Sequence, residues 1–197
     1  MSKLLLARHG ETEWNALGKL QGHTDIPLNE AGRAQARALA EALGGHGLTA
    51  VCTSDLARAR ETGAIVAAAL GLPPPATEPA LRERRFGVFE GKTRAECAAM
   101  HPEAWRAWQE QGASPPEAEE HDAVVQRMEH ALRRLAARAV GATLVVSHGG
   151  VMRLWLQRVS PAPVPLIGNG ATFQVDWSGP APRAEVLLRR VDGIGER

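Results

Sequence analysis

The chain has 197 residues, a length that suits one domain with a sizeable buried core. Lys and Arg total 23 and Asp and Glu total 22, so the formal net charge is +1. This balance excludes a uniformly basic surface of the kind that general nucleic-acid binders and proteins bound to anionic membranes present. Any positive field is therefore expected to be local.

The start of the chain and its cysteines bear on the cellular compartment. The opening MSKLLLARHG lacks the apolar length and the small-residue cleavage site of a secretion signal. No segment has the roughly 20 apolar residues that span a membrane. Cys52 and Cys97 lie outside any CxxC or CxxH spacing, and we expect two free, at least half-buried thiols in a reducing compartment. The expected location is the cytoplasm.

Strand-like and helix-like segments alternate along the chain, which predicts an α/β sandwich with a largely parallel sheet. Asn29 is predicted to cap a helix that ends at Gly44, and Ser54 to cap a helix that stops at Gly71. Helices are also predicted over 123–139 and 151–159, and strands over 3–7, 49–53, 143–147, 172–177 and 185–191.

The segment 90–120 is less regular than its surroundings. It contains Trp105 and Trp108, followed by a polar, proline-bearing stretch over 111–120. Two tryptophans three residues apart on a helix favour core or lid packing over a base-stacking platform. We interpret the segment as an insertion over the sheet that acts as a lid, rather than as a second domain.

Two histidines occupy matched positions in the sequence. His9 and His148 each follow a predicted strand and precede a glycine. Residues just beyond the carboxyl ends of parallel strands line a common crevice, so we expect the two rings to face each other there. Either histidine alone is more often structural. A metal site is not expected, because the residues beside them are not further His or carboxylates at ligand spacing.

Two arginines indicate which ligand this crevice takes. Arg8 precedes His9, and Arg58 lies in the first turn of the helix after the second strand. A guanidinium fork matches phosphate oxygens, and positioned cations stabilise the charge that phosphoryl transfer spreads over those oxygens. Two arginines and a second histidine can do this without Mg²⁺. The alternative for Arg58 is a solvated helix arginine such as Arg60.

Four motifs occur in order along nearly the whole chain. They are LARHGETEWN over 6–15 with its QG, PL and Gly32 continuation, SDLARA with Thr62, LRE with FG and EG over 81–91, and SHGG over 147–150. Together they resemble the signature of the histidine phosphatase superfamily, also called the phosphoglycerate mutase-like family, in its small phosphatase branch. The resemblance implies a three-layer α/β/α sandwich with a mostly parallel central sheet, a short lid insertion around 90–120, and one domain over 1–197.

The resemblance also implies a role for each matching residue. His9 would be the nucleophile that is transiently phosphorylated, and Glu83 the proton donor to the leaving oxygen. The phosphate cradle would consist of Arg8, Arg58 and His148, with further substrate contacts from Asn15, Gln21, Gly22, Arg84 and Gly149. No metal or other cofactor is expected for this chain. The expected partner is a small phosphorylated substrate, the expected assembly a monomer or homodimer, and neither nucleic acid nor membrane is expected to bind.

Several of these residues have plainer interpretations. Glu83 could be a surface glutamate paired with a neighbouring arginine, and Glu13 is a second, weaker candidate for the acid. Arg84 and Arg85 either serve a second anionic group or are solvated. Where many small phosphatases of the family carry Gly-Glu-Ser, this chain has AEE at 118–120. Glu120 at the mouth of the site would disfavour highly anionic substrates, or is simply solvated.

Three functions compete. A metabolite phosphomonoesterase leads, because the family's mutases are longer and carry basic residues in the insertion, whereas 109–122 contains no Lys or Arg. A phosphoglycerate mutase is the second, with the same chemistry. The third is a non-catalytic phosphate-binding or protein-interaction module on the same fold. A phosphoprotein substrate is also open.

Overall fold

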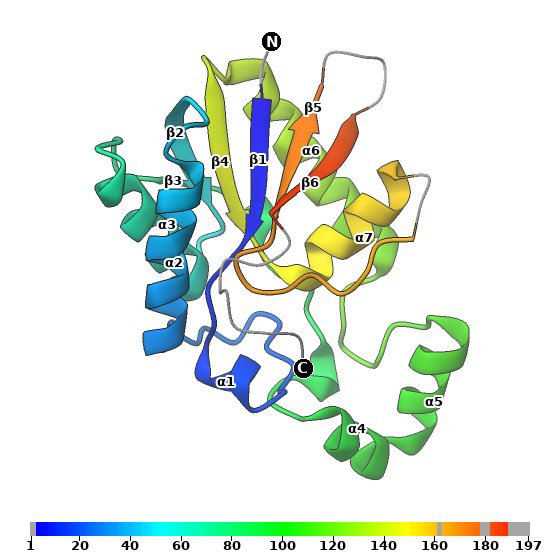
Figure 1. The fold of residues 1–197 in the computed structure, drawn as a ribbon. Helices are drawn as coiled ribbons and strands as arrows, with labels where there is room; N and C mark the ends of the chain where they lie inside the picture. The colour runs from blue at the N-terminus through cyan, green and yellow to red at the C-terminus, as the bar shows by residue number, and fades with distance from the viewer. Residues whose placement is uncertain (1–2, 161–162, 178–181, 189–197) are drawn as a thin grey trace.

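The computed structural model describes residues 3–160, 163–177 and 182–188, and its ribbon is drawn in Figure 1. A six-stranded sheet in the order β3-β2-β4-β1-β5-β6 forms its centre. The first four strands in this order pair in parallel, and β5 runs antiparallel to both of its neighbours, so the predicted mostly parallel sheet is confirmed. The strands are β1 Lys3–Arg8, β2 Leu48–Thr53, β3 Ala76–Thr77, β4 Ala142–Ser147, β5 Thr172–Asp176 and β6 Arg183–Leu188.

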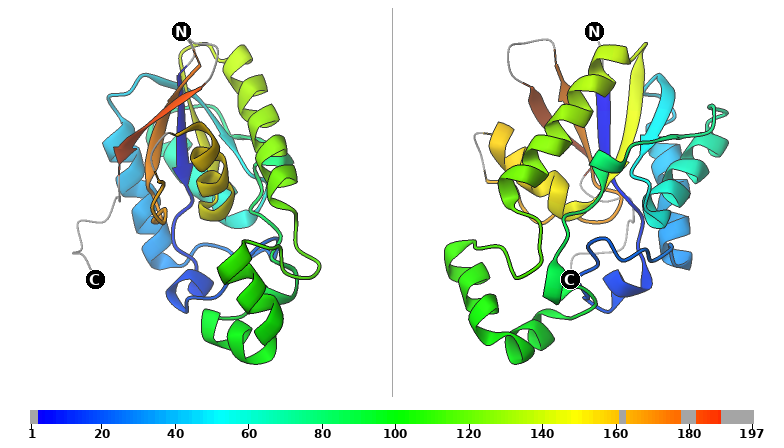
Figure 2. Two further views of the ribbon diagram at one scale, coloured as in Figure 1. Left: turned by 90° about the vertical axis from the view of Figure 1, so that its right-hand side faces the viewer. Right: turned by 180° about the vertical axis from the view of Figure 1, so that it is seen from behind.

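The side chains of β1 show why helices cover both faces of the sheet. Leu4 and Leu6 point to one face, where they pack against α6 (His121–Arg138) and α7 (Gly149–Val159). Leu5 and Ala7 point to the other face, against α2 (Glu30–Leu43) and α3 (Ala57–Ala69). A strand that is buried on both sides requires two helical layers. The predicted three-layer sandwich is therefore confirmed, as the side view in Figure 2 shows.

The helix ends test two predicted caps. Asn29 caps α2 as predicted, and its side chain accepts a hydrogen bond from Gly32 N–H. The prediction that Ser54 caps α3 is wrong, because the helix begins at Ala57 and its N-cap position is Leu56, which has no capping side chain. The carboxylate of Asp25 accepts the Ala57 N–H at 2.6 Å instead. A residue from another loop therefore supplies the cap that the local sequence lacks.

The segment 90–120 is more ordered than its sequence pattern indicates. It contains α4 (Arg94–Met100) and α5 (Pro102–Gln111), which lie beyond the carboxyl ends of the parallel strands (Figures 1 and 2). Trp105 and Trp108 pack against Phe89 with ring centroids 5.8 and 5.4 Å away, so their packing role is confirmed. This cluster gives the segment a small core of its own. Its action as a lid stays a prediction.

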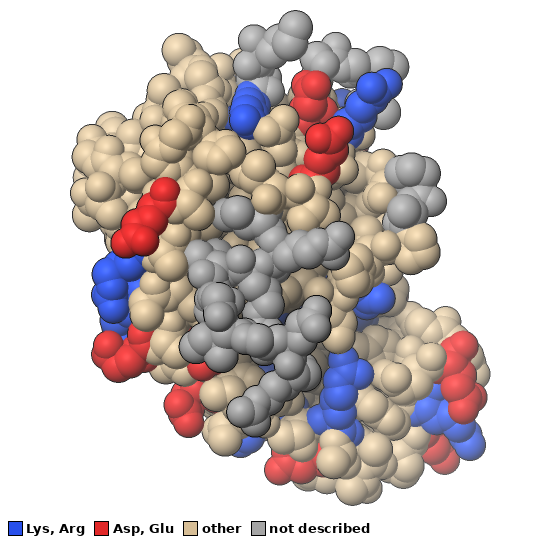
Figure 3. Space-filling model, viewed as in Figure 1, with Lys and Arg blue, Asp and Glu red and all other residues tan. Residues whose placement is uncertain are grey.

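The remaining boundaries agree to within a few residues. The short helix α1 (Glu13–Ala16), the edge strand β3, and the 3₁₀ turns Pro79–Leu81 and Gly87–Phe89 are absent from the sequence-based assignment. Residues 189–191 of the last predicted strand lie outside the described part of the chain. Within that part, every helix is too short or too polar to cross a bilayer. Basic and acidic side chains are interspersed over the face in Figure 3, in keeping with the near-zero net charge.

Candidate active site

His9 and His148 meet at one edge of the sheet. They follow β1 and β4, which are paired neighbours, and the His9 N–H donates to the Ser147 carbonyl at 3.0 Å. Their ring centroids are 5.0 Å apart, and their exposed fractions are only 3% and 0%. The predicted pair of facing histidines is confirmed. As the sequence predicted, the two histidines meet because they follow parallel strands whose carboxyl ends lie at the same edge of the sheet.

The surroundings of His9 determine which of its ring nitrogens is free. Nδ1 lies 2.6 Å from the Gly10 carbonyl oxygen, which can only accept, so Nδ1 carries the hydrogen. Burial, followed by the charges of Arg58 and Arg8, holds the pKa of His9 well below its ordinary value. The ring is therefore neutral at physiological pH, with its lone pair on Nε2. An unprotonated nitrogen beside two guanidinium groups is suited to attack an anionic phosphorus centre.

His148 has the opposite arrangement. Its Nδ1 accepts a hydrogen bond from Arg58 Nε at 3.2 Å, so the hydrogen of the neutral ring is on Nε2. Burial, then the charge of Arg58, lowers the pKa of His148 well below its ordinary value. Its Nε2 and the Nε of Arg8 are buried and have no hydrogen-bond partner among the described residues. Two buried donors without acceptors beside His9 are what a bound oxyanion would satisfy.

Arg58 is completely buried, so the interpretation as a solvated helix arginine is wrong. Its two Nη atoms donate to the carbonyls of Thr24 at 3.0 Å and Gly22 at 2.8 Å. Gly22 has φ +55, a backbone conformation that side-chain-bearing residues rarely adopt. Burial lowers the pKa of Arg58 to about 10, which still leaves it charged at neutral pH. The turn that contains Gly22 and Thr24 therefore fixes the orientation of the Arg58 guanidinium.

Glu83 is held at the same edge. Its exposed fraction is 8%, and its carboxylate accepts backbone N–H groups from Arg84 at 2.7 Å, Gly150 at 2.9 Å and Val151 at 2.8 Å. A Cβ on Gly150 would lie 2.6 Å from Glu83 Oε1, so glycine permits this approach. The surface-glutamate alternative is wrong, and Arg82 pairs with Asp55 instead, at 2.6 Å. The first turn of α7 thus orients the carboxylate.

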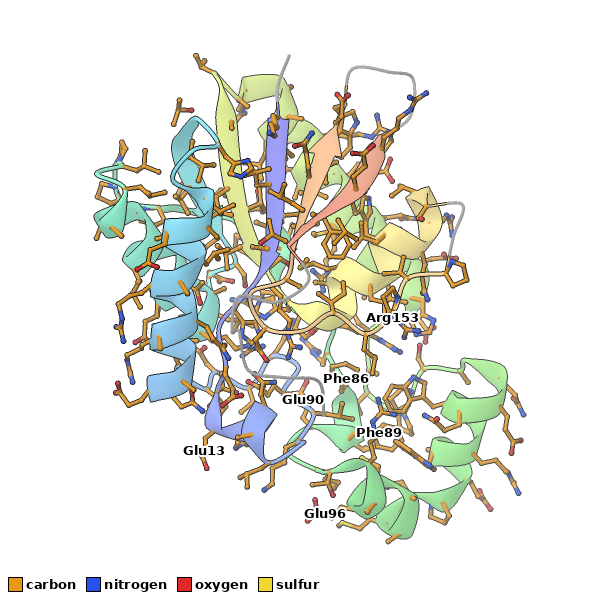
Figure 4. The ribbon with its side chains drawn as sticks, in the orientation of Figure 1. Glu13, Phe86, Phe89, Glu90, Glu96 and Arg153 are labelled. Atoms are coloured by element: carbon orange, nitrogen blue, oxygen red, sulfur yellow. The ribbon has the colours of Figure 1, made fainter. Side chains whose placement is uncertain are left out.

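These groups open onto a cavity of about 490 Å³. All predicted site residues line it except His148, whose ring contacts that of His9, and Gly22, which contributes its carbonyl to Arg58. Glu13 is exposed on α1 and points away from the cavity (Figure 4), so it is not placed to act as the acid. Arg84 lines the cavity, whereas Arg85 is exposed and does not line it.

The AEE departure does not make the cavity acidic. Glu119 is paired with Arg127 at 2.7 Å, and Glu120 is exposed and accepts a hydrogen bond from Ser114 Oγ at 2.9 Å. Neither lines the cavity, and Glu83 is the only carboxylate among the described residues that do. Of the two alternatives for Glu120, the one that places it at the mouth of the site is therefore wrong. Both carboxylates are used in fixing the loop that precedes α6.

Two supporting residues were missed or given no role from sequence. Asn169 Nδ2 donates to the His9 carbonyl at 3.0 Å. Thr62 Oγ1 accepts the Gly10 N–H at 3.0 Å and donates to the Arg58 carbonyl at 2.7 Å. An asparagine between two glycines just before β5 was a weak signal for the first. Thr62 lies one helical turn after Arg58, which was the available signal for the second.

Arg127 on α6 was also missed, and it joins three parts of the site. Its guanidinium donates to the carbonyls of Arg82 at 2.7 Å and Glu83 at 3.0 Å, and to the Ala80 carbonyl at 2.8 Å. It also holds both carboxylate oxygens of Glu119, at 2.7 and 2.9 Å. The main chain of Glu83 therefore depends on a side chain that lies outside the cavity.

We expect Arg127→Ala to lower the free energy of unfolding by about 2–3 kcal/mol, because carbonyls and a half-buried carboxylate lose a charged donor. Arg134→Ala is the matched control on the same helix, since the Arg134 side chain is half exposed and makes a single ion pair, with Glu78, among the described residues. The control should stay within about 1 kcal/mol of wild type. Urea unfolding measures both, and equal losses in the two variants would contradict the role of Arg127.

The buried histidines predict a pH-dependent stability. In the folded protein the pKa of His148 lies well below 6.5, its ordinary value in an unfolded chain. As the pH falls below that value, the unfolded state binds a proton that the folded state does not, so stability falls. This one histidine should account for about 1.4 kcal/mol of stability lost from about pH 7.5 to about pH 5.5.

The measurement is urea unfolding of wild type and His148→Gln at both pH values. The loss on acidification should be smaller in the variant by about the amount given for one histidine. His130→Gln, at an exposed position on α6, is the control and should keep the wild-type dependence. A His148→Gln protein with the full wild-type dependence would mean that His148 titrates alike in both states.

Three comparisons relate this chain to known proteins. Residues 4–185 match the model of the histidine phosphatase superfamily (branch 1). The chain is 39% identical to phosphoglycerate mutase-like protein 4 of Arabidopsis thaliana over 166 residues, covering 82% of this chain and 72% of that protein. It is 38% identical to the metal-independent phosphoserine phosphatase of the same plant over 167 residues, covering 82% and 70%.

A solved structure shares the whole fold. A mycobacterial glucosyl-3-phosphoglycerate phosphatase superposes with a TM-score of 0.82 at 28% identity, covering 94% of this chain and 97% of that one. Among the described residues, no group of three or more His, Cys, Asp and Glu side chains is placed to hold a metal ion. The family match covers most of the chain, including both histidine motifs. The chain belongs to the histidine phosphatase superfamily.

Proposed function

We propose that this chain is a phosphomonoesterase that hydrolyses a small phosphorylated metabolite through a phosphohistidine on His9, without a metal ion. The observation that carries the proposal is the neutral His9, with Nε2 unprotonated beside the unpartnered donors of Arg8 and His148. Two of the relatives are named as phosphatases, one of them metal-independent. Both support a phosphatase and neither identifies the substrate of this chain.

In the first half-reaction the Nε2–P bond forms as the P–O ester bond breaks. Arg8, Arg58 and the Nε2–H of His148 balance the charge on the transferring oxygens. Glu83, in its acid form, gives its proton to the leaving oxygen, which departs as an alcohol. The Gly10 carbonyl accepts from Nδ1–H and so stabilises the positive charge on the phosphorylated ring.

The second half-reaction returns the enzyme to its starting state. The Glu83 carboxylate takes a proton from a water molecule while that water's oxygen attacks phosphorus in line. The N–P bond breaks, inorganic phosphate leaves, and His9 is again neutral with its hydrogen on Nδ1. Glu83 is thus acid in the first step and base in the second. Its hydrogen bonds from the Gly150 and Val151 N–H groups hold it beside the first turn of α7.

A phosphoglycerate mutase is the second candidate, and the basic residues that line the cavity support it. Lys19, Arg84, Arg94 and Arg153 line the cavity in addition to Arg8 and Arg58. Although 109–122 contains no Lys or Arg, other segments therefore supply basic side chains to the cavity. One relative is also named phosphoglycerate mutase-like. A mutase would interconvert 2- and 3-phosphoglycerate with little free phosphate.

The test is a panel of metabolite phosphates with a phosphate-release readout in the presence of EDTA, run beside the mutase assay. Phosphate release from members of the panel supports the phosphatase. Isomerisation without release supports the mutase. Absence of turnover in both assays would contradict each of them and favour the non-catalytic module.

We also infer that the protein acts alone or as a homodimer in the cytoplasm, on small molecules rather than on nucleic acid or membranes. The two buried, unpaired thiols of Cys52 and Cys97 support a reducing compartment. Size-exclusion chromatography with light scattering tests the assembly.

A further inference from the structure

One stripe of α7 forms a wall of the cavity. Gly149, Gly150, Arg153, Leu154 and Gln157 all line it, a spacing that places them on one face of a helix with 3.6 residues per turn. The stripe begins at the glycines beside His148 and Glu83 and continues for two turns away from them. It therefore extends along whatever organic group is attached to a phosphate bound at His9.

Arg153 is the charged residue on this wall, and its guanidinium is anchored. Its Nε donates to the Val164 carbonyl at 3.2 Å, in the loop that follows α7. Neither of its Nη atoms has a hydrogen bond or ion pair with another described side chain. In Figure 4 it projects from the side of α7 that faces the α4–α5 segment, in the direction of Phe86. A half-buried arginine fixed at one nitrogen presents its remaining donors to the cavity.

The neighbours of Arg153 do not neutralise it. Asp122 pairs with Arg158 of the same helix α7, at 3.3 Å. The carboxylate of Glu83 accepts hydrogen bonds from backbone N–H groups. The apolar side chains of Leu154 and Leu166 line the cavity beside it, and Leu166 is 74% exposed. A guanidinium without an ion-pair partner can bind an oxyanion through its free N–H donors.

The guanidinium of Arg84, unlike that of Arg153, is engaged by other residues of the protein through two of its nitrogens. Its Nε donates to the Glu119 carbonyl and its Nη2 to Ser114 Oγ, both at 3.0 Å, so it is committed to fixing the loop before α6. Lys19 and Arg94 also line the cavity, from the loop after α1 and from the start of α4, and the ammonium of Lys19 lies 5.9 Å from the ring centroid of Trp14. Of the cations beyond the phosphate site, Arg153 is the one on the helix that also positions His148 and Glu83.

We propose that Arg153 is a second anion site, and that the substrate carries a carboxylate or second phosphate in addition to its phosphoester. Because Arg153 follows Gly149 by four residues, its Cα lies about 6 Å further along the helix axis. Leu154 and Leu166 would contact the carbon skeleton between the two charges. This inference rests on the proposed function, since it names the class of phosphomonoester that the cavity accepts.

The experiment compares two substrates that differ in one group. Glycerol 3-phosphate and 3-phosphoglycerate share a carbon skeleton, but one ends in a hydroxymethyl group and the other in a carboxylate. Phosphate release gives kcat/KM for wild type, Arg153→Gln and the control Arg158→Gln, which changes an exposed arginine on the same helix. Competitive inhibition by inorganic phosphate reports whether the phosphate site is intact.

Wild type should prefer the carboxylate substrate. Arg153→Gln should lose about 10–100-fold in kcat/KM on that substrate, and about 3-fold or less on glycerol 3-phosphate. Its inhibition constant for inorganic phosphate should not change, and Arg158→Gln should behave as wild type.

Three results would overturn the inference: equal kcat/KM of wild type on the two substrates, equal loss on both in Arg153→Gln, or loss of the preference in Arg94→Gln but not in Arg153→Gln. The last would place the second anion beside α4, where Arg94 lies. Failure of the proposed function has a different signature, because then neither substrate releases phosphate and no other phosphomonoester does.

Discussion

His9→Ala should lose phosphatase activity by at least about 10⁴-fold and should carry no covalent phosphate, because the nitrogen that bonds to phosphorus is gone. Phosphohistidine is a phosphoramidate, so the label on wild type should be lost in acid and survive in base. The measurement is rapid acid-free quenching of enzyme with a ³²P-labelled substrate, followed by gel separation.

The matched control for this variant is His130→Ala, an exposed histidine on α6. It should be labelled and active like wild type. His9→Ala should also fold, because the ring is neutral and, among the described residues, hydrogen-bonds only to the adjacent Gly10 carbonyl. A folded His9→Ala protein that retains activity or a label would end the proposed mechanism.

Glu83→Gln should divide substrates by their leaving group. Alkyl phosphates release a poorly stabilised alkoxide and need a proton, so we expect kcat to fall by about 10²–10⁴-fold for them. Nitrophenyl phosphate releases a stable phenolate and should lose less than about 10-fold. The measurement is phosphate release from both substrates across a pH series.

The rival acid supplies the control. Glu13→Gln changes an exposed glutamate on α1 and should leave both substrates unaffected. Equal losses of Glu83→Gln on alkyl and aryl phosphates would indicate that Glu83 only supports the site. Such support is physically plain, because its carboxylate accepts three backbone hydrogen bonds.

The sequence predicted the pairing of His9 and His148 because two strand–His–Gly segments need only adjacent parallel strands to meet. It assigned Arg58 to the phosphate cradle only through the family resemblance, since spacing alone could not separate it from Arg60. The helix period also made α6 and α7 predictable to within two residues. Local rules thus sufficed wherever the partner of a residue lies on a regular element.

What the sequence could not predict depends on contacts between distant loops. The N–H of Ala57 at the start of α3 is capped by Asp25. Ser54 is a residue type that caps helices, but the helix begins three residues after it. The sequence placed the stretch 118–120 near the substrate site, but Glu119 is bound by Arg127 of α6, and none of the three residues lines the cavity. The charge of the cavity likewise arises from Lys19, Arg94 and Arg153, which no single segment brings together.

The position of β1 in the sheet has a consequence for how this site comes into being. The strand that carries His9 is made first, yet both of its hydrogen-bonded neighbours, β4 and β5, are made in the last third of the chain. Such non-local pairing gives a high contact order, which slows folding relative to a helical bundle. Until residues 142–147 have been synthesised, β1 and β2 lack the strand β4 that lies between them in the sheet. The two histidines are therefore brought together late, and the nascent chain acquires its phosphate site only when the sheet closes around its first strand.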